Sequence, residues 1–236
     1  MVKRNRVAII PARGGSKRLP RKNILDFGGR PMLAWTIEAA CQTSLFDRIV
    51  VSTEDEEIAR IAVNAGAEVP FLRDSLHDDI TPISDVTIAA VTKLRDIFDE
   101  DYETTVQLMA NCPLREANDI RAAIAAFDTS GGNFQISCTR FGWLNPWWAL
   151  QLDINGHGEW MFPDAARSRS QDLAPLYSPT GAIWIARTRA LEQAGTFYGP
   201  GHRFEPLAWH AAVDIDDAED LALARTVFKM KQDAQN

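Results

Sequence analysis

The chain has 236 residues, of which 46% are hydrophobic and 24% charged, and its formal net charge is −7. This length and composition are typical of one globular α/β domain with a sizeable core. The acidic balance argues against general nucleic-acid binding, which depends on positive charge. No apolar run approaches the roughly 18 residues of a membrane span, so we expect no membrane partner.

The cysteines and the start of the chain indicate the compartment. Cys41, Cys112 and Cys138 are widely spaced and odd in number, which fits neither a disulfide framework nor a zinc site. The basic first residues lead into an apolar run that is too short for the core of a signal peptide. We therefore expect a cytoplasmic protein.

The most informative stretch runs from Val7 to Asn23 and reads VAIIPARGGSKRLPRKN. Its apolar start predicts a buried parallel strand, and the glycine pair that follows predicts a tight turn. Backbone N–H groups in such a turn can cradle phosphate oxygens. The first thirty residues hold nine Lys or Arg and one acid, although the whole chain is acidic. This local excess predicts an anionic ligand rather than a merely solvated loop.

The spacing of the glycines differs from two familiar phosphate motifs. Gly14 and Gly15 are adjacent, which matches neither the G-x-x-x-x-G-K-[ST] of P-loop NTPases nor the G-x-G-x-x-G of dinucleotide dehydrogenases. The loop therefore points away from both classes.

The rest of the chain alternates predicted strands and helices, as in a mostly parallel α/β sheet. Residues 73–82 are predicted to form a polar loop, and residues 195–206 a surface loop. Ser84, just after the polar loop, is a candidate cap of the helix that runs to about Phe98. Strands are predicted at 48–53, 67–72, 104–109, 134–139, 181–186 and 208–213. Helices are predicted at 31–41, from a Thr53 cap to about 64, and at 84–98, 117–127 and 217–230.

Four consecutive acids, at 54–57, follow the predicted strand 48–53. Thr53 and Glu56 have capping-box spacing, and Gly66 suits the residue just after the helix. We interpret the acids as a first helical turn that complements the helix dipole, rather than as a metal site.

Two further acids, Asp214 and Asp216, stand two residues apart at the end of the predicted strand 208–213. This spacing places both side chains on one face, where they repel each other unless a cation lies between them. Mg²⁺ commonly binds one or two carboxylates together with substrate phosphates. We expect a Mg²⁺ site here; the alternative is that Asp216 only caps the following helix.

The stretch 141–163 has a different character. It contains Trp143, Trp147, Trp148 and Trp160, and Asn155–Gly156 predicts a hairpin turn. A tryptophan-rich hairpin that leaves an α/β core exposes a large apolar area, which indicates a partner surface. The alternative is a hairpin folded back on its own core.

Taken in order, these segments resemble the acylneuraminate cytidylyltransferases, which activate sialic acid and related nine-carbon keto sugar acids as CMP conjugates. The resemblance covers nearly the whole chain. It rests on IIPARGGSKRLPRKN at 9–23, ILDFGGRPMLAWTI at 24–37, RIVVSTEDEEI at 48–58, GAEV at 66–69, GAI at 181–183 and VDID at 213–216. It implies a three-layer α/β fold like that of the nucleotide-diphosphosugar transferases, formed by one domain over residues 1–236. It also implies a dimerisation arm at about 140–176, and hence a homodimer.

The resemblance further implies a reaction of CTP with a nine-carbon keto sugar acid that yields the CMP-sugar acid and pyrophosphate. Arg13 and Lys22 would neutralise the charge that develops on the transferring phosphorus. Asp214 and Asp216 would hold Mg²⁺. Asp216 could also act as the general base, although deprotonation by metal coordination is the simpler option. The implied nucleotide contacts are Ala12, Arg13, Gly14, Gly15, Lys22, Asn23, Arg73, Ser84 and Asp85. For Ser84 the capping interpretation stays open.

The chain departs from the family pattern where the sugar acid would bind. Met109 stands where the family usually has glutamine, and Thr180 where it usually has asparagine. The implied sugar-acid contacts are Met109, Arg167, Arg169, Gln171 and Thr180, with Arg167 or Arg169 on the carboxylate. The departures leave the particular sugar acid open, including sugar acids of bacterial surface glycans. They also leave open a nucleotidyltransferase for another sugar or sugar phosphate, and a non-catalytic nucleotide-binding homologue.

Overall fold

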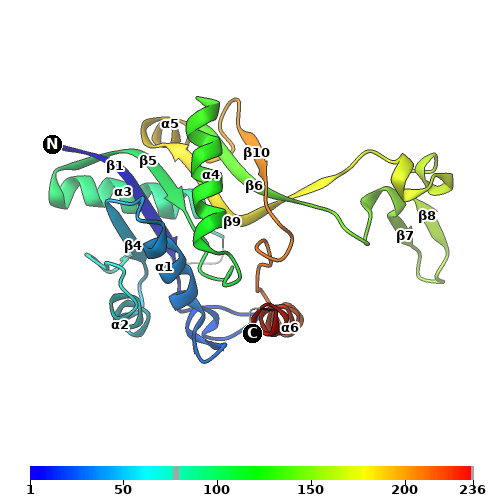
Figure 1. The fold of residues 1–236 in the computed structure, drawn as a ribbon, viewed down its shortest axis with the longest axis horizontal. Coiled ribbons are helices and arrows are strands. Elements are labelled where there is room, and N and C mark those ends of the chain that lie inside the picture. Colours follow the sequence, from blue (N-terminus) through cyan, green and yellow to red (C-terminus); the bar gives the residue numbers. More distant parts are fainter. Residues whose placement is uncertain (77–79, 235–236) are drawn as a thin grey trace.

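The computed structural model describes residues 1–76 and 80–234. At its centre lies a six-stranded sheet in the order β10-β6-β9-β5-β1-β4 (Figure 1). Neighbouring strands are parallel except in the two pairs that involve β9, so the predicted mostly parallel sheet is confirmed. The strands are β1 (Val2–Pro11), β4 (Arg48–Ser52), β5 (Glu100–Gln107), β6 (Phe134–Arg140), β9 (Tyr177–Arg187) and β10 (Arg203–Pro206).

Helices cover both faces of the sheet and produce the predicted three layers (Figure 1). Along β1, Ala8 and Ile10 pack into the cluster that contains α1, α2 and α4, whereas Val7 and Ile9 pack with α3. All four side chains are fully buried, which is why this strand is a continuous apolar run. The helices are α1 (Met32–Thr43), α2 (Glu56–Asn64), α3 (Ile83–Phe98), α4 (Ala117–Ser130), α5 (Thr188–Ala194) and α6 (Ala218–Asp233).

Two of these helices extend the core beyond its central layers. Leu191 of α5 packs with Phe134 and Ile136 of β6, and Leu221 of α6 packs with Leu114 and Ile215. The last helix is thereby fixed against the loop that follows β5. Short elements complete the core: β2 (Asp26–Phe27), which pairs with β3 (Arg30–Pro31), and the 3₁₀ turn Lys22–Ile24.

The sequence prediction was wrong at three elements. Residues 67–72 form only one isolated bridge, between Val50 and Glu68, and residues 208–213 form turns closed by bonds such as Ala211 N–H to the Ala208 carbonyl. The strand at this end of the chain is instead β10, inside the predicted surface loop 195–206. Its four residues lie at the sheet edge and are mostly exposed, so they carry no apolar pattern. The predicted loop 73–82 includes residues 77–79, which lie outside the described residues.

Residues 141–176 leave the core between β6 and β9 and project from it as an arm (Figure 1). In the arm, β7 (Leu150–Leu152) pairs antiparallel with β8 (Gly158–Trp160), and Gly156 turns the chain with φ +84°, so the predicted hairpin is confirmed. Trp147 packs edge-on against Phe162. The arm also has short 3₁₀ turns at Pro146–Trp148, Ala165–Arg167 and Ser170–Asp172.

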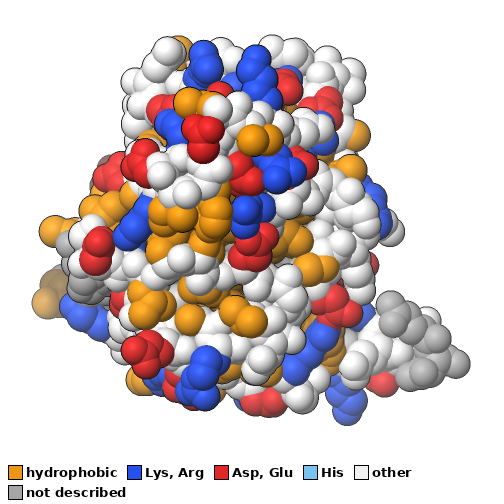
Figure 2. Space-filling view, turned by 90° about the vertical axis from the view of Figure 1, so that its left-hand side faces the viewer, with side chains coloured by type: hydrophobic (Ala, Val, Ile, Leu, Met, Phe, Trp, Pro, Cys, Tyr) orange, Lys and Arg blue, Asp and Glu red, His pale blue; other side chains and the backbone are white. Residues whose placement is uncertain are grey.

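The end of the molecule opposite the arm has a mixed surface. Figure 2 shows lysine and arginine side chains interspersed with acidic ones there, with hydrophobic side chains in small groups between them. No helix within residues 1–76 and 80–234 is long and apolar enough to cross a bilayer.

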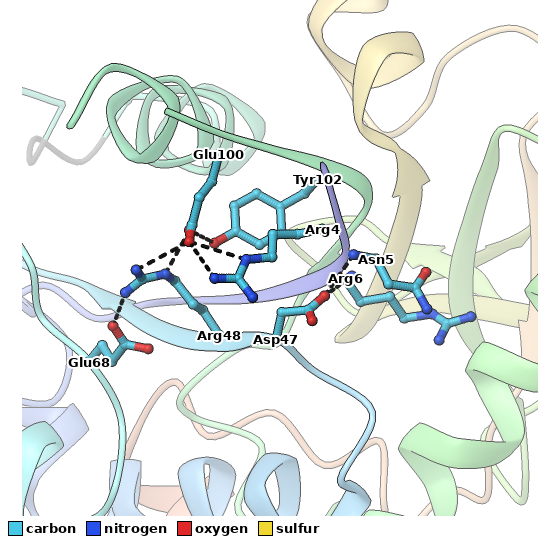
Figure 3. Close-up of polar contacts among 8 residues, drawn as sticks. All are labelled: Arg4, Asn5, Arg6, Asp47, Arg48, Glu68, Glu100 and Tyr102. Carbon is cyan, nitrogen blue, oxygen red and sulfur yellow. Dashed lines mark hydrogen bonds and ion pairs between the residues drawn. The ribbon is translucent and has the colours of Figure 1, made fainter. Parts of the chain in front are cut away.

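A buried ionic cluster ties the amino ends of three neighbouring strands together (Figure 3). Glu100, at the start of β5, is 4% exposed and accepts hydrogen bonds from Arg4 of β1, from Arg48 of β4 and from the Tyr102 hydroxyl. Burial alone would raise the pKa of Glu100, but the bonds from Arg48, Tyr102 and Arg4 outweigh it and lower the pKa from 4.5 to about 2. Nearby, Asp47 accepts from the N–H groups of residues 5 and 6.

We predict that Glu100→Gln destabilises the fold by about 3 kcal/mol near neutral pH, because the lowered pKa corresponds to that much differential stabilisation of the carboxylate. This contribution is present above the unfolded-state pKa and is lost as the pH falls toward the folded-state value. The wild type should therefore lose more stability than Glu100→Gln between about pH 4.5 and pH 2. Urea unfolding across this range measures both effects.

The matched control is Glu103→Gln on the same strand. The carboxylate of Glu103 is 64% exposed and pairs with Arg187, so its loss should cost less than about 1 kcal/mol. Equal losses in the two variants would contradict the special role of the buried cluster.

Candidate active site

A cavity of about 290 Å³ opens where β1 and β5 end, at the carboxyl edge of the sheet. In open α/β sheets ligands bind at this edge. The loop after β1, the loop after β5 and the segment before α6 all contribute to its wall. The structure thus brings both predicted chemical centres into one cavity. The predicted site residues that line it are Ala12, Arg13, Lys22, Asn23, Arg73, Met109, Asp214 and Asp216.

The loop after β1 is closed by Asn23. Its side chain is 6% exposed, and its Nδ2 donates to the Arg13 carbonyl at 2.9 Å. This bond joins the two ends of the basic loop and holds the backbone of Ala12 and Arg13 at the cavity wall. Asn23 therefore acts on the loop itself as well as facing the cavity.

Acidic side chains from the start of α2 meet the glycine turn. The Gly14 N–H donates to Glu54 Oε1 at 2.7 Å, and the other oxygen of Glu54 accepts from Arg73 Nη2 at 2.6 Å. A Cβ on Gly14 would lie 2.5 Å from Asp55 Oδ2, whereas a Cβ on Gly15 would meet nothing within 4 Å. The close approach of Asp55 is the reason that position 14 requires glycine.

The interpretation of residues 53–57 needs correction. The N-cap of α2 is Asp55, which accepts from the N–H groups of Glu57 and Ile58, and not Thr53. Only Glu56 and Glu57 lie in the first helical turn. Asp55 and Glu57 both pair with Arg21, which has φ +58°. The acids therefore hold the basic loop in addition to any interaction with the helix dipole.

Asp214 and Asp216 converge in an irregular segment, not at the end of a strand as the sequence predicted. Asp216 accepts from Lys22 Nζ at 2.7 Å and from Arg18 Nη2 at 2.5 Å. Asp214 accepts from the side-chain amide of Asn111. The N-cap of α6 is Asp217, whose side chain accepts from the N–H groups of Glu219 and Asp220, so the alternative that Asp216 caps this helix is wrong. Asp216 is thus left to face the cavity.

The two carboxylates have different proton affinities. Burial, followed by the charge of Asp216, raises the pKa of Asp214 to about 6. Burial also acts to raise the pKa of Asp216, but the hydrogen bond and charge of Lys22, together with Arg18, outweigh it and lower that pKa. The charges of Lys22 and Arg18 also act to lower the pKa of Asp214, but burial and the charge of Asp216 outweigh them.

Only part of the predicted sugar-acid set reaches the cavity. Met109 lines it, and a Cβ on Gly181 would lie 3.0 Å from Met109 Cγ and 3.4 Å from Asp214 Oδ2. The Thr180 hydroxyl instead bonds to Ser137 Oγ at 2.7 Å. Gln107, two residues before Met109, is fully buried and its Oε1 accepts from Thr87.

Gly14 and Gly15 of the turn do not line the cavity, and five other predicted residues also lie away from its wall. Ser84 is buried in the first turn of α3, where its hydroxyl accepts from the Phe197 N–H at 3.4 Å, and the N-cap position is Pro82, so the capping prediction for Ser84 was wrong. Asp85 lies beside it on the same turn. The arm carries Arg167, Arg169 and Gln171, all exposed, and Arg169 pairs with Asp172 there.

Sequence reasoning missed two residues of the site, Glu54 and Asn111. Each follows the end of a buried strand within a few residues, Glu54 after β4 and Asn111 after β5. The carboxyl ends of parallel strands meet at one edge, so this position was a usable signal for both.

A basic glycine turn that faces two carboxylates at the carboxyl edge of a three-layer sheet defines a site of the nucleotidyltransferase type. Comparisons with known proteins agree. The family model for cytidylyltransferases matches residues 7–139. The solved structure of a CMP:2-keto-3-deoxy-manno-octonic acid synthetase in complex with CTP superposes with a TM-score of 0.71 at 17% identity, covering 97% of this chain and 100% of that one.

Relatives in sequence narrow the class. A pseudaminic acid cytidylyltransferase of Campylobacter jejuni is 33% identical over 97% of this chain and 98% of its own. A CMP-N,N'-diacetyllegionaminic acid synthase of Legionella pneumophila is 32% identical over the same shares. An N-acylneuraminate cytidylyltransferase of Streptococcus agalactiae is 30% identical over 91% of this chain and 51% of its own. The chain belongs to the cytidylyltransferase family and is a nucleotidyltransferase.

We predict that Gly14→Ala destabilises the protein by about 1–3 kcal/mol, because the new methyl group displaces Asp55 from its cap and from Arg21. Gly15→Ala is the matched control, since its methyl group meets no atom of the chain. Urea unfolding of the two variants measures the difference. A Gly14→Ala protein as stable as Gly15→Ala would show that Asp55 does not constrain the turn.

Proposed function

We propose that the chain transfers the CMP group of CTP to a nonulosonic acid, a nine-carbon keto sugar acid, and releases pyrophosphate. The observation that carries the proposal is the single cavity in which the basic glycine loop and the pair Asp214 and Asp216 meet. The names of the relatives support this substrate class, because they describe pseudaminic, legionaminic and acylneuraminic acid enzymes. The free thiols Cys41, Cys112 and Cys138 support a reducing compartment, and we propose the cytoplasm.

In the proposed reaction the anomeric hydroxyl of the sugar acid attacks the α-phosphorus of CTP. A new bond forms between the hydroxyl oxygen and the α-phosphorus. The bond from the α-phosphorus to the oxygen shared with the β-phosphate breaks, so pyrophosphate leaves, and a base takes the hydroxyl proton. Arg13 and Lys22 would neutralise the triphosphate and the charge that develops at phosphorus. Asp216 is the weaker option for that base, because Lys22 and Arg18 lower its pKa and so make it a poorer proton acceptor.

We further propose that Asp214 and Asp216 hold Mg²⁺. The donor set fits a hard cation, because it offers two carboxylates and leaves the other ligand positions to phosphate oxygens and water. The mutual repulsion of Asp214 and Asp216, which Lys22 and Arg18 offset only in part for Asp214, supports this assignment. A bound Mg²⁺ would supply Lewis-acid activation and charge neutralisation on the phosphates.

We also propose that two copies of the chain form a homodimer through the arm. The arm exposes large apolar side chains, among them Trp143, Leu150 and Leu152, and exposed apolar surface of this extent is typical of an interface. Arg167, Arg169 and Gln171 belong to this arm, which projects from the core (Figure 1), and they do not line the cavity of their own chain. In a homodimer the arm would bring them to the site of the other copy, where an arginine would bind the sugar carboxylate.

The primary test is pyrophosphate release from CTP and Mg²⁺ with a panel of nine-carbon and eight-carbon keto sugar acids. We predict that Asp214→Asn and Asp216→Asn each reduce kcat by at least about 100-fold without unfolding the protein. Asp217→Asn is the control: asparagine also caps helices well, so its activity and stability should stay near wild type.

Near-normal turnover of both Asp214→Asn and Asp216→Asn would remove these carboxylates from the mechanism. CTP binding by the wild type without pyrophosphate release, over the whole panel, would favour the alternative of a non-catalytic nucleotide-binding homologue. Release with a sugar phosphate alone would favour a different nucleotidyltransferase.

The dimer proposal is tested by mixing two inactive proteins. We predict that a double variant, Arg167→Ala with Arg169→Ala, is inactive, and that it regains activity when its subunits are exchanged with those of Asp214→Asn. One site of such a mixed dimer combines an intact cavity with an intact arm from the other copy.

Light scattering tests the dimer itself. It should give the mass of two chains for the wild type, and a Leu150→Glu, Leu152→Glu variant should be monomeric. The control Met230→Glu changes an exposed side chain of α6. No recovery in the mixture would overturn the shared site.

A further inference from the structure

The side chain of Asn111 lies between the two carboxylates of the cavity. It is 3% exposed, and its Nδ2 faces three acceptors. These are Asp214 Oδ1, the Ile215 carbonyl at 3.1 Å and Asp216 Oδ1 at 3.4 Å. The backbone carbonyl of Asn111 also accepts from the Ile215 N–H at 3.0 Å. One residue thus contacts three consecutive residues of the acidic segment.

These contacts matter because residues 213–216 belong to no strand. Two carboxylates on an irregular segment repel each other, and without donors they would move apart. Lys22 and Arg18 hold Asp216 from the side of the basic loop. Asn111 holds Asp214 and Ile215 from a different segment, the loop after β5.

The loop that carries Asn111 is itself fixed at Arg115, which is 1% exposed. The guanidinium of Arg115 donates to the carbonyl of Ala182 on β9 and to Thr36 Oγ1 on α1, the latter at 2.9 Å. Asn111 therefore stands on a loop attached to two neighbouring elements, and its amide is held in place beside the acids.

We propose that Asn111 is a positioning residue that keeps Asp214 and Asp216 side by side for a divalent cation. The inference rests on the proposed metal role of the two acids. A neutral amide suits this task, because it satisfies buried carboxylate oxygens without cancelling their charge. A lysine in the same place would instead compete with the cation.

Two variants test the proposal, with Mn²⁺ alone as the probe. In Asn111→Ala the donors are lost, and the affinity for Mn²⁺, measured by electron paramagnetic resonance, should fall by about 10–100-fold, as it does when partners that orient metal ligands are removed. In Asn111→Asp a third carboxylate joins the pair. In EDTA the melting temperature of Asn111→Asp should be lower than that of the wild type. Added Mn²⁺ should raise the melting temperature of Asn111→Asp more than that of the wild type.

The control is Asn118→Asp on α4, the same chemical change at an exposed position beside Arg121. It should show the wild-type affinity for Mn²⁺ and the wild-type response to EDTA. Conservative rescue gives a further check: Asn111→Gln should retain more Mn²⁺ affinity than Asn111→Ala, since it keeps an amide.

The outcomes separate this inference from the proposed function. If the wild type binds Mn²⁺ and both Asn111→Ala and Asn111→Asp behave like Asn118→Asp, the positioning role is wrong while the metal site stands. If the wild type binds no Mn²⁺ and turns over in EDTA, the metal role of Asp214 and Asp216 fails, and the role of Asn111 fails with it.

Discussion

The candidate site depends on the ion pair between Lys22 and Asp216, whose Nζ and Oδ1 atoms are 2.7 Å apart across 194 positions of sequence. Lys22 belongs to the loop after β1, and Asp216 to the irregular segment before α6. Neither segment is a regular strand, so the sheet does not position them directly. Both residues line the cavity, so the pair places a cation and an anion on the same wall.

Ion pairs between distant segments also explain how the fold tolerates the basic start of the chain. Glu54, Asp55 and Glu57, at the beginning of α2, engage the Gly14 N–H, Arg21 and Arg73. These contacts compensate part of the positive charge and fix the shape of the turn without burying it completely. A turn held in this way keeps its shape without a ligand, which is the condition under which electrostatic stabilisation is most effective, but its Gly14 N–H already donates to Glu54. The opposite edge of the sheet is secured separately, by the cluster around Glu100.

The core and the arm carry different parts of the predicted site. The residues predicted to bind the nucleotide and the metal lie mostly at the cavity of one chain, whereas Arg167, Arg169 and Gln171 lie on the arm. The departures from the family pattern, Met109 and Thr180, both fall on the sugar side. Of these, Met109 reaches the cavity and Thr180 bonds to Ser137 behind it. Under the proposed function, Met109 is therefore the departure that lies where it can alter which sugar acid is accepted.

The sequence by itself determined the layers, the hairpin and the position of the basic loop, because each depends on local signals: continuous apolar runs, an Asn-Gly turn and a dense set of cations. It also identified Asp214 and Asp216, although it assigned them to a strand that does not form. The tertiary structure decided what these local signals do not encode. Asn111, Glu54 and Asp55 gain their roles from partners 34 to 105 positions away, and the short edge strand β10 exists only because β6 offers it a backbone to pair with. Contacts of this kind arise when the sheet brings distant loops to one edge, so no pattern within a short window of sequence can specify them.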